Sequence, residues 1–210
     1  MKRNEQFPLE GHTALVTSSS RNLGAEIVRV LAASGANIIT TYFQSKSAAE
    51  ELLDEIADTP GTHSTVHGDT HSATTTCLLL ESAIAAAPET IDILVNNAGT
   101  NAPQMFVDVT EENYDKVMDL NVKSAVFVAQ AVARKMIDQG TGGSIIHMSS
   151  QMGHVGSPTR TIYCTSKHAI EGLNKAMAVE LAPHNIRVNA VGPTYIETAM
   201  TAPNFADPVF

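Results

Sequence analysis

A tyrosine and a lysine stand four residues apart in the segment YCTSK, which begins at Tyr163 and ends at Lys167. On a helix, this spacing places both side chains on one face, where their polar ends can reach the same ligand. A phenol can exchange a proton with a reacting oxygen, and a nearby cation favours its ionised form. Such pairs are also common on solvated helices, so the spacing alone does not indicate catalysis.

A hydroxyl group joins this pair. Ser150 stands thirteen residues before Tyr163, directly after the apolar segment 143–149, which we expect to be a buried strand. Parallel strands deliver the side chains at their carboxyl ends to one crevice. A phenol, an ammonium group and a hydroxyl there suit carbonyl reduction, in which the oxygen takes up a proton. At about 4 Å and an effective dielectric constant near 20, Lys167 would favour the phenolate by roughly 4 kcal/mol, about three pKa units before desolvation.

Short β-branched runs alternate with longer segments of helical period along the chain. This alternation predicts the α/β class, with a parallel sheet covered by helices. The strands are predicted over 12–17, 37–42, 62–68, 91–96, 143–149 and 186–191, and the helices over 22–34, 45–57, 71–87, 110–139 and 160–182. No repeat or long linker divides the chain, so we expect residues 1–210 to form one domain.

Composition excludes several kinds of partner. The chain carries 13 lysines and arginines against 22 aspartates and glutamates, a formal net charge of −9, which disfavours nucleic-acid binding. No apolar run approaches the roughly 18 residues of a membrane span, and the N-terminus lacks the pattern of a signal peptide, so we expect a cytoplasmic protein without a membrane partner. The 2 cysteines and 8 histidines lack the spacing of a disulfide framework or a metal site, so we expect neither.

Two predicted strand ends suit a nucleotide. The first strand runs through TSSSRNLG, residues 17–24, directly into a helix, and free backbone N–H groups at such a turn can hold a phosphate. A serine-rich turn can also be a simple helix cap. The fourth strand ends in NNAG, residues 96–99, which lets a flat ligand approach the backbone or forms a plain polar turn. In a sheet of order 3-2-1-4-5-6 these two ends are neighbours beside the ligand crevice.

Together these motifs resemble those of the short-chain dehydrogenase/reductase family, over nearly the whole chain from Leu9 to about Met200. TSSSRNLG resembles the family's TGxxxGxG loop, NNAG its fourth-strand motif, YCTSK its YxxxK motif and VGPTYIET its PG motif. The resemblance implies a doubly wound, Rossmann-like three-layer sandwich. It also implies a carbonyl reductase, similar to the 3-oxoacyl-carrier-protein reductases, that acts on a small ketone or alcohol.

The resemblance assigns four catalytic residues. Tyr163 is then the acid and base, Lys167 lowers its pKa and holds the nicotinamide ribose, and Ser150 hydrogen-bonds the substrate oxygen. Asn121 supports a proton relay to Lys167 through water. The cofactor-binding residues that it implies are Thr17, Ser20, Arg21, Asn22, Leu23, Gly24, Tyr42, Ser45, Lys46, Asp69, Thr70, Asn97, Ala98, Gly99, Tyr163, Lys167, Pro193, Ile196 and Thr198.

The second predicted strand favours NADP(H) over NAD(H). An acidic residue at its end would accept hydrogen bonds from the adenosine ribose and repel a 2′-phosphate, but Tyr42 stands there. Arg21 occupies a position where NADP-dependent relatives often place a basic residue, and Lys46 follows nearby. Arg21 also occurs in relatives that use NAD, and Lys46 can equally be a solvated charge at a helix start.

The sequence also departs from the family pattern. Ser18 and Asn22 replace two glycines of the nucleotide loop, and Thr194 replaces the glycine of the PG motif. Asparagine tolerates a left-handed backbone, whereas a left-handed Ser18 would cost about 1–2 kcal/mol. Relatives continue through a further helix and a seventh strand after the point where this sequence ends, so we expect the fold to lack both.

The family also suggests a homo-oligomer, a dimer or tetramer, because relatives pair the helices that correspond to 110–139 and 160–182. Two alternatives to a carbonyl reductase remain. A cofactor-binding pseudoenzyme or regulatory scaffold would explain the changed nucleotide loop, although the catalytic residues are intact. A sugar-nucleotide epimerase or dehydratase shares YxxxK but normally has a longer substrate domain.

Overall fold

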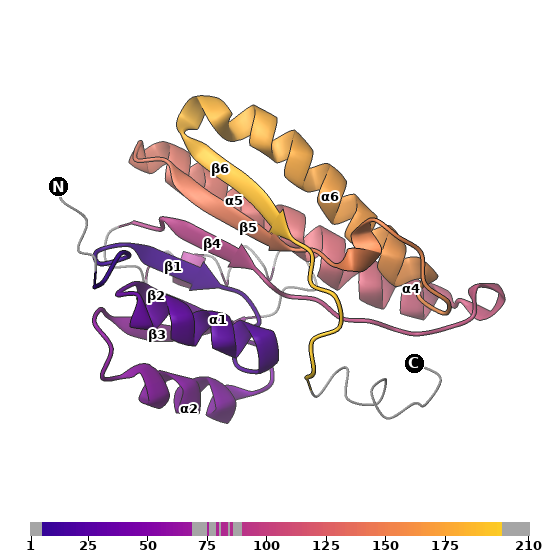
Figure 1. Cartoon of the computed structure of the whole chain (residues 1–210), viewed down its shortest axis with the longest axis horizontal. Coiled ribbons are helices and arrows are strands. Elements are labelled where there is room, and N and C mark those ends of the chain that lie inside the picture. Colours follow the sequence, from indigo (N-terminus) through magenta and orange to yellow (C-terminus); the bar gives the residue numbers. More distant parts are fainter. Residues whose placement is uncertain are drawn as a thin grey trace.

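A parallel sheet forms the centre of the computed structural model, which describes residues 6–68, 75, 79, 81–83, 85 and 90–198. The strands of the described residues are β1 (Thr13–Val16), β2 (Asn37–Tyr42), β3 (His63–His67), β4 (Ile93–Asn96), β5 (Gly143–Met148) and β6 (Ile186–Val191). They lie in the order β3-β2-β1-β4-β5-β6 (Figure 1). The predicted strands are confirmed, several of them one or two residues shorter at their ends. The order reverses between β1 and β4, where open α/β sheets bind their ligands.

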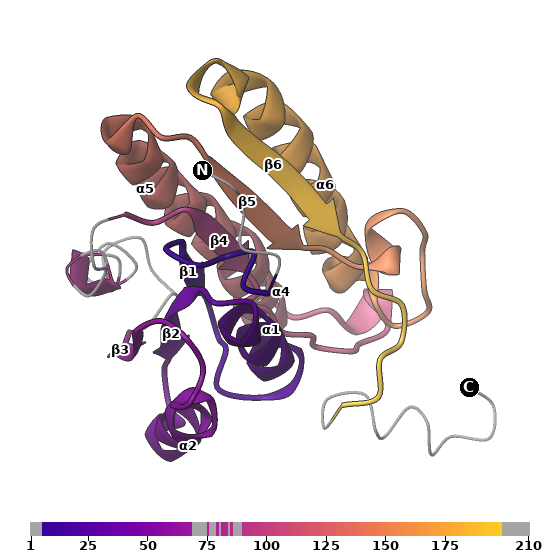
Figure 2. The ribbon, with the colours of Figure 1, turned by 60° about the vertical axis from the view of Figure 1, so that its left-hand side comes forward.

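Helices cover both faces of this sheet, as predicted. They are α1 (Asn22–Ala33), α2 (Lys46–Ile56), α4 (Glu111–Met118), α5 (Ser124–Gln139) and α6 (Thr161–Leu181). Helices α1 and α2 lie on one face, and α5 and α6 lie on the other (Figure 2). Within the predicted helix 71–87, the described positions are helical. The three layers confirm the doubly wound, Rossmann-like architecture.

Consecutive apolar residues in the strands pack alternately into two hydrophobic cores, one on each face of the sheet. Leu94 packs in the cluster that includes Val128 of α5, whereas its neighbour Val95 packs in the cluster that includes Val28 of α1. Because side chains alternate between the faces of a strand, a strand buried on both faces needs apolar residues without interruption. This double burial holds the central strands, and hence their carboxyl ends, in fixed positions.

The predicted helix over 110–139 is confirmed, because residues 111–139 are helical without a break, but a π-helical turn, Asp119–Lys123, lies between α4 and α5. Within this turn, the Asn121 side chain pairs with the backbone of Thr100. Its Oδ1 accepts from Thr100 N at 2.7 Å, and its Nδ2 donates to Thr100 O at 2.9 Å. A π-helical turn adds one residue within a helix, and the apolar periodicity of this segment did not reveal it.

Strand β6 lies at one edge of the sheet in the described part of the chain, with β5 as its neighbour. The expectation of a missing last helix and strand concerns the chain end, and residues 199–210 lie outside the described residues. No helix in the described ranges combines the length and apolar character needed to cross a membrane.

Candidate active site

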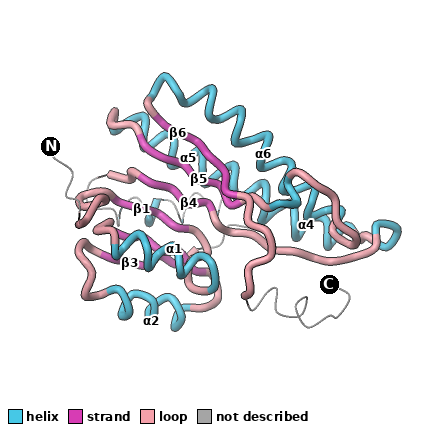
Figure 3. The backbone as a smooth tube through the Cα atoms, viewed as in Figure 1, coloured by secondary structure: helices cyan, strands magenta, loops and turns pink. Residues whose placement is uncertain are grey.

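A cleft of about 410 Å³ opens at the carboxyl edge of the sheet. Its walls come from the segments that follow β1, β2, β4 and β5, together with α6 and residues 193–198. Figure 3 shows that the loops after β4 and β6 leave the sheet on the same side. The cleft therefore includes the point between β1 and β4 where the strand order reverses, as the predicted strand order requires.

The loop between β1 and α1 forms one end of the cleft. Both residues that replace family glycines, Ser18 and Asn22, have a left-handed backbone, with φ values of 50° and 52°. No side chain caps the start of α1, which begins after Arg21. A Cβ on Gly24 would lie 2.7 Å from Asn97 Nδ2 and 2.8 Å from Ser18 O, so only glycine fits there. The loop is thus compact and leaves the first N–H groups of α1 without a side-chain partner.

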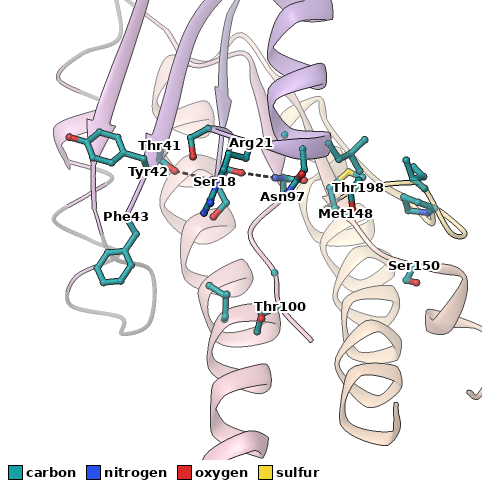
Figure 4. A pocket seen from close by; sticks show the side chains of 18 of the residues that line it. Ser18, Arg21, Thr41, Tyr42, Phe43, Asn97, Thr100, Met148, Ser150 and Thr198 are labelled. Carbon is teal, nitrogen blue, oxygen red and sulfur yellow. Dashed lines mark hydrogen bonds between the residues drawn. The ribbon is translucent and has the colours of Figure 1, made fainter. Parts of the chain in front are cut away.

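The end of β4 holds this loop. Thr17 Oγ1 accepts hydrogen bonds from the backbone nitrogens of Asn97, at 2.9 Å, and Ala98, at 3.0 Å. In return, Asn97 Nδ2 donates to Thr17 O at 3.0 Å. It also donates to Ser18 O at 3.1 Å, a bond drawn in Figure 4. Thr17 and Ala98 are buried behind the cleft, so they support the cleft rather than line it.

The opposite end of the cleft carries the three groups from which the sequence argument began. Ser150 follows β5, while Tyr163 and Lys167 lie on the first turns of α6. Lys167 Nζ is 5.6 Å from the centre of the Tyr163 ring and donates to the carbonyl oxygen of Met148 at 2.7 Å. Ser150 and Tyr163 both line the cleft, and Ser150 is close enough to influence the pKa of Tyr163. The structure therefore brings the hydroxyl, the phenol and the ammonium group into one cleft.

Burial dominates the electrostatics of this end. It raises the pKa of Tyr163 above its ordinary value of 10.0, and the neighbouring Ser150 hydroxyl offsets only part of this effect. Burial also lowers the pKa of Lys167 from 10.5 to about 8. Desolvation of the phenol exceeds the effects of Ser150 and Arg160, which lower its pKa, and the lowering that we expected from Lys167 stays a prediction.

Asn121 lies behind the cleft, with 1% of its surface exposed. Besides its two bonds to Thr100, its Nδ2 donates to Ser166 Oγ at 3.0 Å. A Cβ on Gly99 would lie 3.4 Å from Asn121 Oδ1 and 3.7 Å from Lys167 Nζ, so Asn121 and Lys167 lie next to the same glycine. The side-chain amide thus joins the loop after β4, the π-helical turn and α6.

The structure gathers most of the predicted site residues. Those that line the cleft are Ser20, Arg21, Asn22, Leu23, Gly24, Tyr42, Ser45, Asn97, Gly99, Ser150, Tyr163, Lys167, Pro193, Ile196 and Thr198. Thr17, Ala98 and Asn121 lie behind the lining, and Lys46 lies outside it, paired with Glu50 at 3.3 Å. Asp69 and Thr70 lie outside the described residues.

Ser18 and Thr194, which lie within recognised motifs but were not assigned to the site, also line the cleft. The sequence argument missed further lining residues, namely Thr41, Phe43, Gln44, Gly68, Thr100, Leu120, Met148 and Ser149. Most of them adjoin a strand end that was already recognised, so extending each motif by a residue or two would have found them. In the described part of the chain, no three His, Cys, Asp or Glu side chains gather as metal ligands would.

Comparisons with known proteins agree with this geometry. The family model for short chain dehydrogenases matches residues 12–208. L-xylulose reductase of Bos taurus is 38% identical over 200 residues, 95% of this chain and 78% of the relative, and carbonyl reductase [NADPH] 2 of Sus scrofa is 35% identical over 212 residues, 97% of this chain and 79% of the relative. The crystal structure of a gluconate 5-dehydrogenase from Burkholderia cenocepacia in complex with NADP and tartrate superposes with a TM-score of 0.90 at 31% identity, covering 98% of this chain and 79% of that one.

The match extends over more than nine-tenths of the sequence, so it includes the nucleotide loop and the Tyr163 and Lys167 pair alike. The chain therefore belongs to the short-chain dehydrogenase/reductase family of oxidoreductases.

Proposed function

We propose that this oxidoreductase interconverts a small ketone and its alcohol by hydride exchange with NADP(H), with Tyr163 as the acid and base. The observation that carries the proposal is the convergence of Ser150, Tyr163 and Lys167 at one end of a cleft whose other end is the loop before α1. A hydroxyl, a phenol and a cation are the groups that carbonyl reduction requires beside the reacting oxygen.

The residues of the cleft fit a dinucleotide. The start of α1 has no side-chain cap and no acidic residue in its first turn, so its N–H groups and its dipole favour a phosphate. Gly24 lets the start of α1 pack closely against Asn97 and Ser18, and both Gly24 and Gly99 line the cleft. Arg21, Tyr42 and Ser45 would surround the adenosine end, and Lys167 the nicotinamide ribose. When bound, the nicotinamide ring supplies or accepts the hydride.

Side chains of the protein would transfer the proton to and from the substrate oxygen. Because the pKa of Tyr163 is raised, its phenol is protonated at neutral pH and can donate to the carbonyl oxygen as the carbon takes up the hydride. Ser150 Oγ would hold that oxygen within reach of the phenol. Lys167 would carry a positive charge close to the oxygen that gains electron density. In the oxidative direction the same groups act in reverse.

The end of β2 supports NADP(H) rather than NAD(H). Tyr42 ends the strand, and no carboxylate follows it among the cleft residues Phe43, Gln44 and Ser45. The exposed Arg21 lies in the cleft lining and can meet a 2′-phosphate, whereas Lys46 is paired with Glu50. The relatives from Sus scrofa and Burkholderia cenocepacia, whose names include NADPH and NADP, add to this argument.

The test is a fluorescence titration with NADPH and NADH, followed by turnover on a panel of carbonyl compounds. The panel should include L-xylulose, 5-ketogluconate, simple ketones and a 3-oxoacyl thioester. We expect tighter binding of NADPH and oxidation of NADPH with at least one of these compounds. Tight cofactor binding without turnover on any compound would instead favour the pseudoenzyme or scaffold function.

We also propose that the chain works as a homo-dimer or homo-tetramer. Val179 of α6 is 77% exposed and Ile137 of α5 is 37% exposed, so the helices that relatives pair leave apolar side chains at the surface. Sedimentation of the protein at micromolar concentration should give twice or four times the mass of one chain. A monomer at all concentrations would contradict this proposal.

A further inference from the structure

We propose that Thr41 is a positioning residue of the nucleotide loop, and that its hydroxyl holds Ser18 in the left-handed conformation that a glycine would adopt unaided. The inference deepens the proposed function, because it concerns the same cofactor site. Only the predicted change in cofactor affinity rests on the proposed function. Its structural part, the coupling between Thr41 and Ser18, stands without any cofactor.

Ser18 has an unfavourable backbone. Its φ of 50° lies in the left-handed region, which residues with a Cβ seldom adopt. Asn22 shares this conformation, but asparagine adopts it more readily than serine. Ser18 is also exposed, so burial of its side chain does not stabilise the conformation. The surrounding contacts must therefore hold this backbone in place.

Thr41 provides these contacts from the second strand. Its Oγ1 accepts a hydrogen bond from Ser18 N at 3.1 Å, shown as a dashed line in Figure 4. Its backbone oxygen accepts from Ser19 N at 3.3 Å, and its backbone nitrogen donates to Ser19 Oγ at 3.3 Å. Thr41 is 3% exposed, so water does not readily replace these bonds.

The other side of the loop is held by Asn97, whose Nδ2 donates to Ser18 O at 3.1 Å. The N–H of Ser18 is thus bonded to β2, and its carbonyl oxygen is bonded to the end of β4. A change of the Ser18 backbone to an ordinary conformation would break both bonds. It would also shift the oxygen against which Gly24 packs, and hence the start of α1, where a phosphate would bind.

The experiment compares Thr41→Val with Thr41→Ser and Thr40→Val, each alone and with Ser18→Gly. Valine keeps the shape and strand propensity of threonine but removes the acceptor, whereas serine restores a hydroxyl. Thr40 is a matched control, because it is a buried threonine of the same strand whose hydroxyl bonds Ser64 O at 3.5 Å. Hydrogen exchange at the amide of position 18 and the dissociation constant for NADPH are the two readouts.

We expect Thr41→Val to accelerate exchange at position 18 and to weaken NADPH binding by about three- to tenfold, the effect of one hydrogen bond. Thr41→Ser should recover most of both losses, and Thr40→Val should change neither by more than about twofold. In the Ser18→Gly background, Thr41→Val should weaken binding by less than about twofold, because glycine adopts the conformation without help.

Equal losses from Thr41→Val in both backgrounds, or unchanged exchange at position 18, would overturn the proposal. The two hypotheses fail in different ways. If the parent chain binds neither NADPH nor NADH, the proposed function fails, while the exchange measurements still decide the role of Thr41. If NADPH binds and Thr41→Val changes neither readout, the proposed function stands and the inference about Thr41 is wrong.

Discussion

Tyr163 and Lys167 are brought together by their helical spacing, but their protonation states are set by burial. Desolvation raises the pKa of the phenol and lowers that of the ammonium group to about 8, so both effects disfavour the charged form. At neutral pH the site therefore holds a protonated phenol beside a lysine that is close to its pKa. This pairing favours proton donation, which is the role that we propose for the phenol in the reductive direction.

Replacing the phenol is the most direct test of its role. Tyr163→Phe should keep the fold and the binding of NADPH but lower kcat by about 100-fold or more, because no other group donates the proton. Tyr114→Phe removes the hydroxyl of a tyrosine on α4 that is 43% exposed and lies outside the cleft lining, so it should leave kcat unchanged. Steady-state kinetics of both variants give the answer, and near-normal turnover of Tyr163→Phe would refute the assignment.

The lysine pKa predicts an alkaline limit for reduction. As the pH rises through about 8, Lys167 loses the proton that gives it its charge, whereas the phenol of Tyr163 stays protonated. The kcat/KM for ketone reduction should therefore fall above pH 8. Lys167→Arg, if active, should move this limit upward, because arginine keeps its charge. A parent profile that stays level to pH 10 would contradict the prediction.

At the scale of the elements, the contact between the π-helical turn and the loop after β4 orders the site from behind. Periodicity predicted a helix through this region but could not reveal the π-helical turn Asp119–Lys123. The physical reason is that hydrogen bonds to a segment distant in the sequence stabilise a π-helical turn and compensate for the loss of regular helical hydrogen bonds. Here the backbone N–H of Thr100 donates to the Asn121 side chain, and the backbone C=O of Thr100 accepts from it.

Removing this contact should destabilise the chain. Asn121→Ala would leave the N–H and C=O of Thr100 without their side-chain partner and should lower the free energy of unfolding by about 1–3 kcal/mol. Asn113→Ala is a suitable comparison, because its Nδ2 bonds the Gln104 side chain at 3.0 Å, away from the cleft. Urea denaturation of both variants measures the difference. Equal small effects would mean that the Asn121 contact contributes little.

At the scale of the whole molecule, a buried histidine links folding to pH. His147 of β5 is 1% exposed, and its Nδ1 lies 3.5 Å from Asn96 Nδ2. Its pKa is lowered from 6.5 to about 4, chiefly by burial and also by the positive charge of Lys167, while the carboxylate of Glu171 acts in the opposite direction. The folded chain therefore keeps His147 neutral at a pH where the unfolded chain protonates it.

This difference predicts a loss of stability in acid. The contribution of neutral His147 is fully present above pH 6.5 and is lost as the pH falls toward 4, at up to about 1.4 kcal/mol per pH unit. His147→Gln removes the titrating group, so its unfolding free energy should vary less over this range. His168→Gln is the control, because His168 is exposed on α6. Parallel pH curves for the parent and His147→Gln would show that other groups govern the acid transition.

The sequence alone determined the strand order, the cleft at its reversal point and most of the residues that line it. The alternation of strands and helices follows from periodicity, which local physics controls, whereas the strand order and the lining residues were expected from the resemblance to a known family. Only the tertiary structure decided the direction of the Tyr163 pKa, the π-helical turn at Asn121 and the contact of Ser18 with Thr41. Each of these depends on burial or on hydrogen bonds between residues far apart in the chain, and a linear pattern does not specify which distant groups meet.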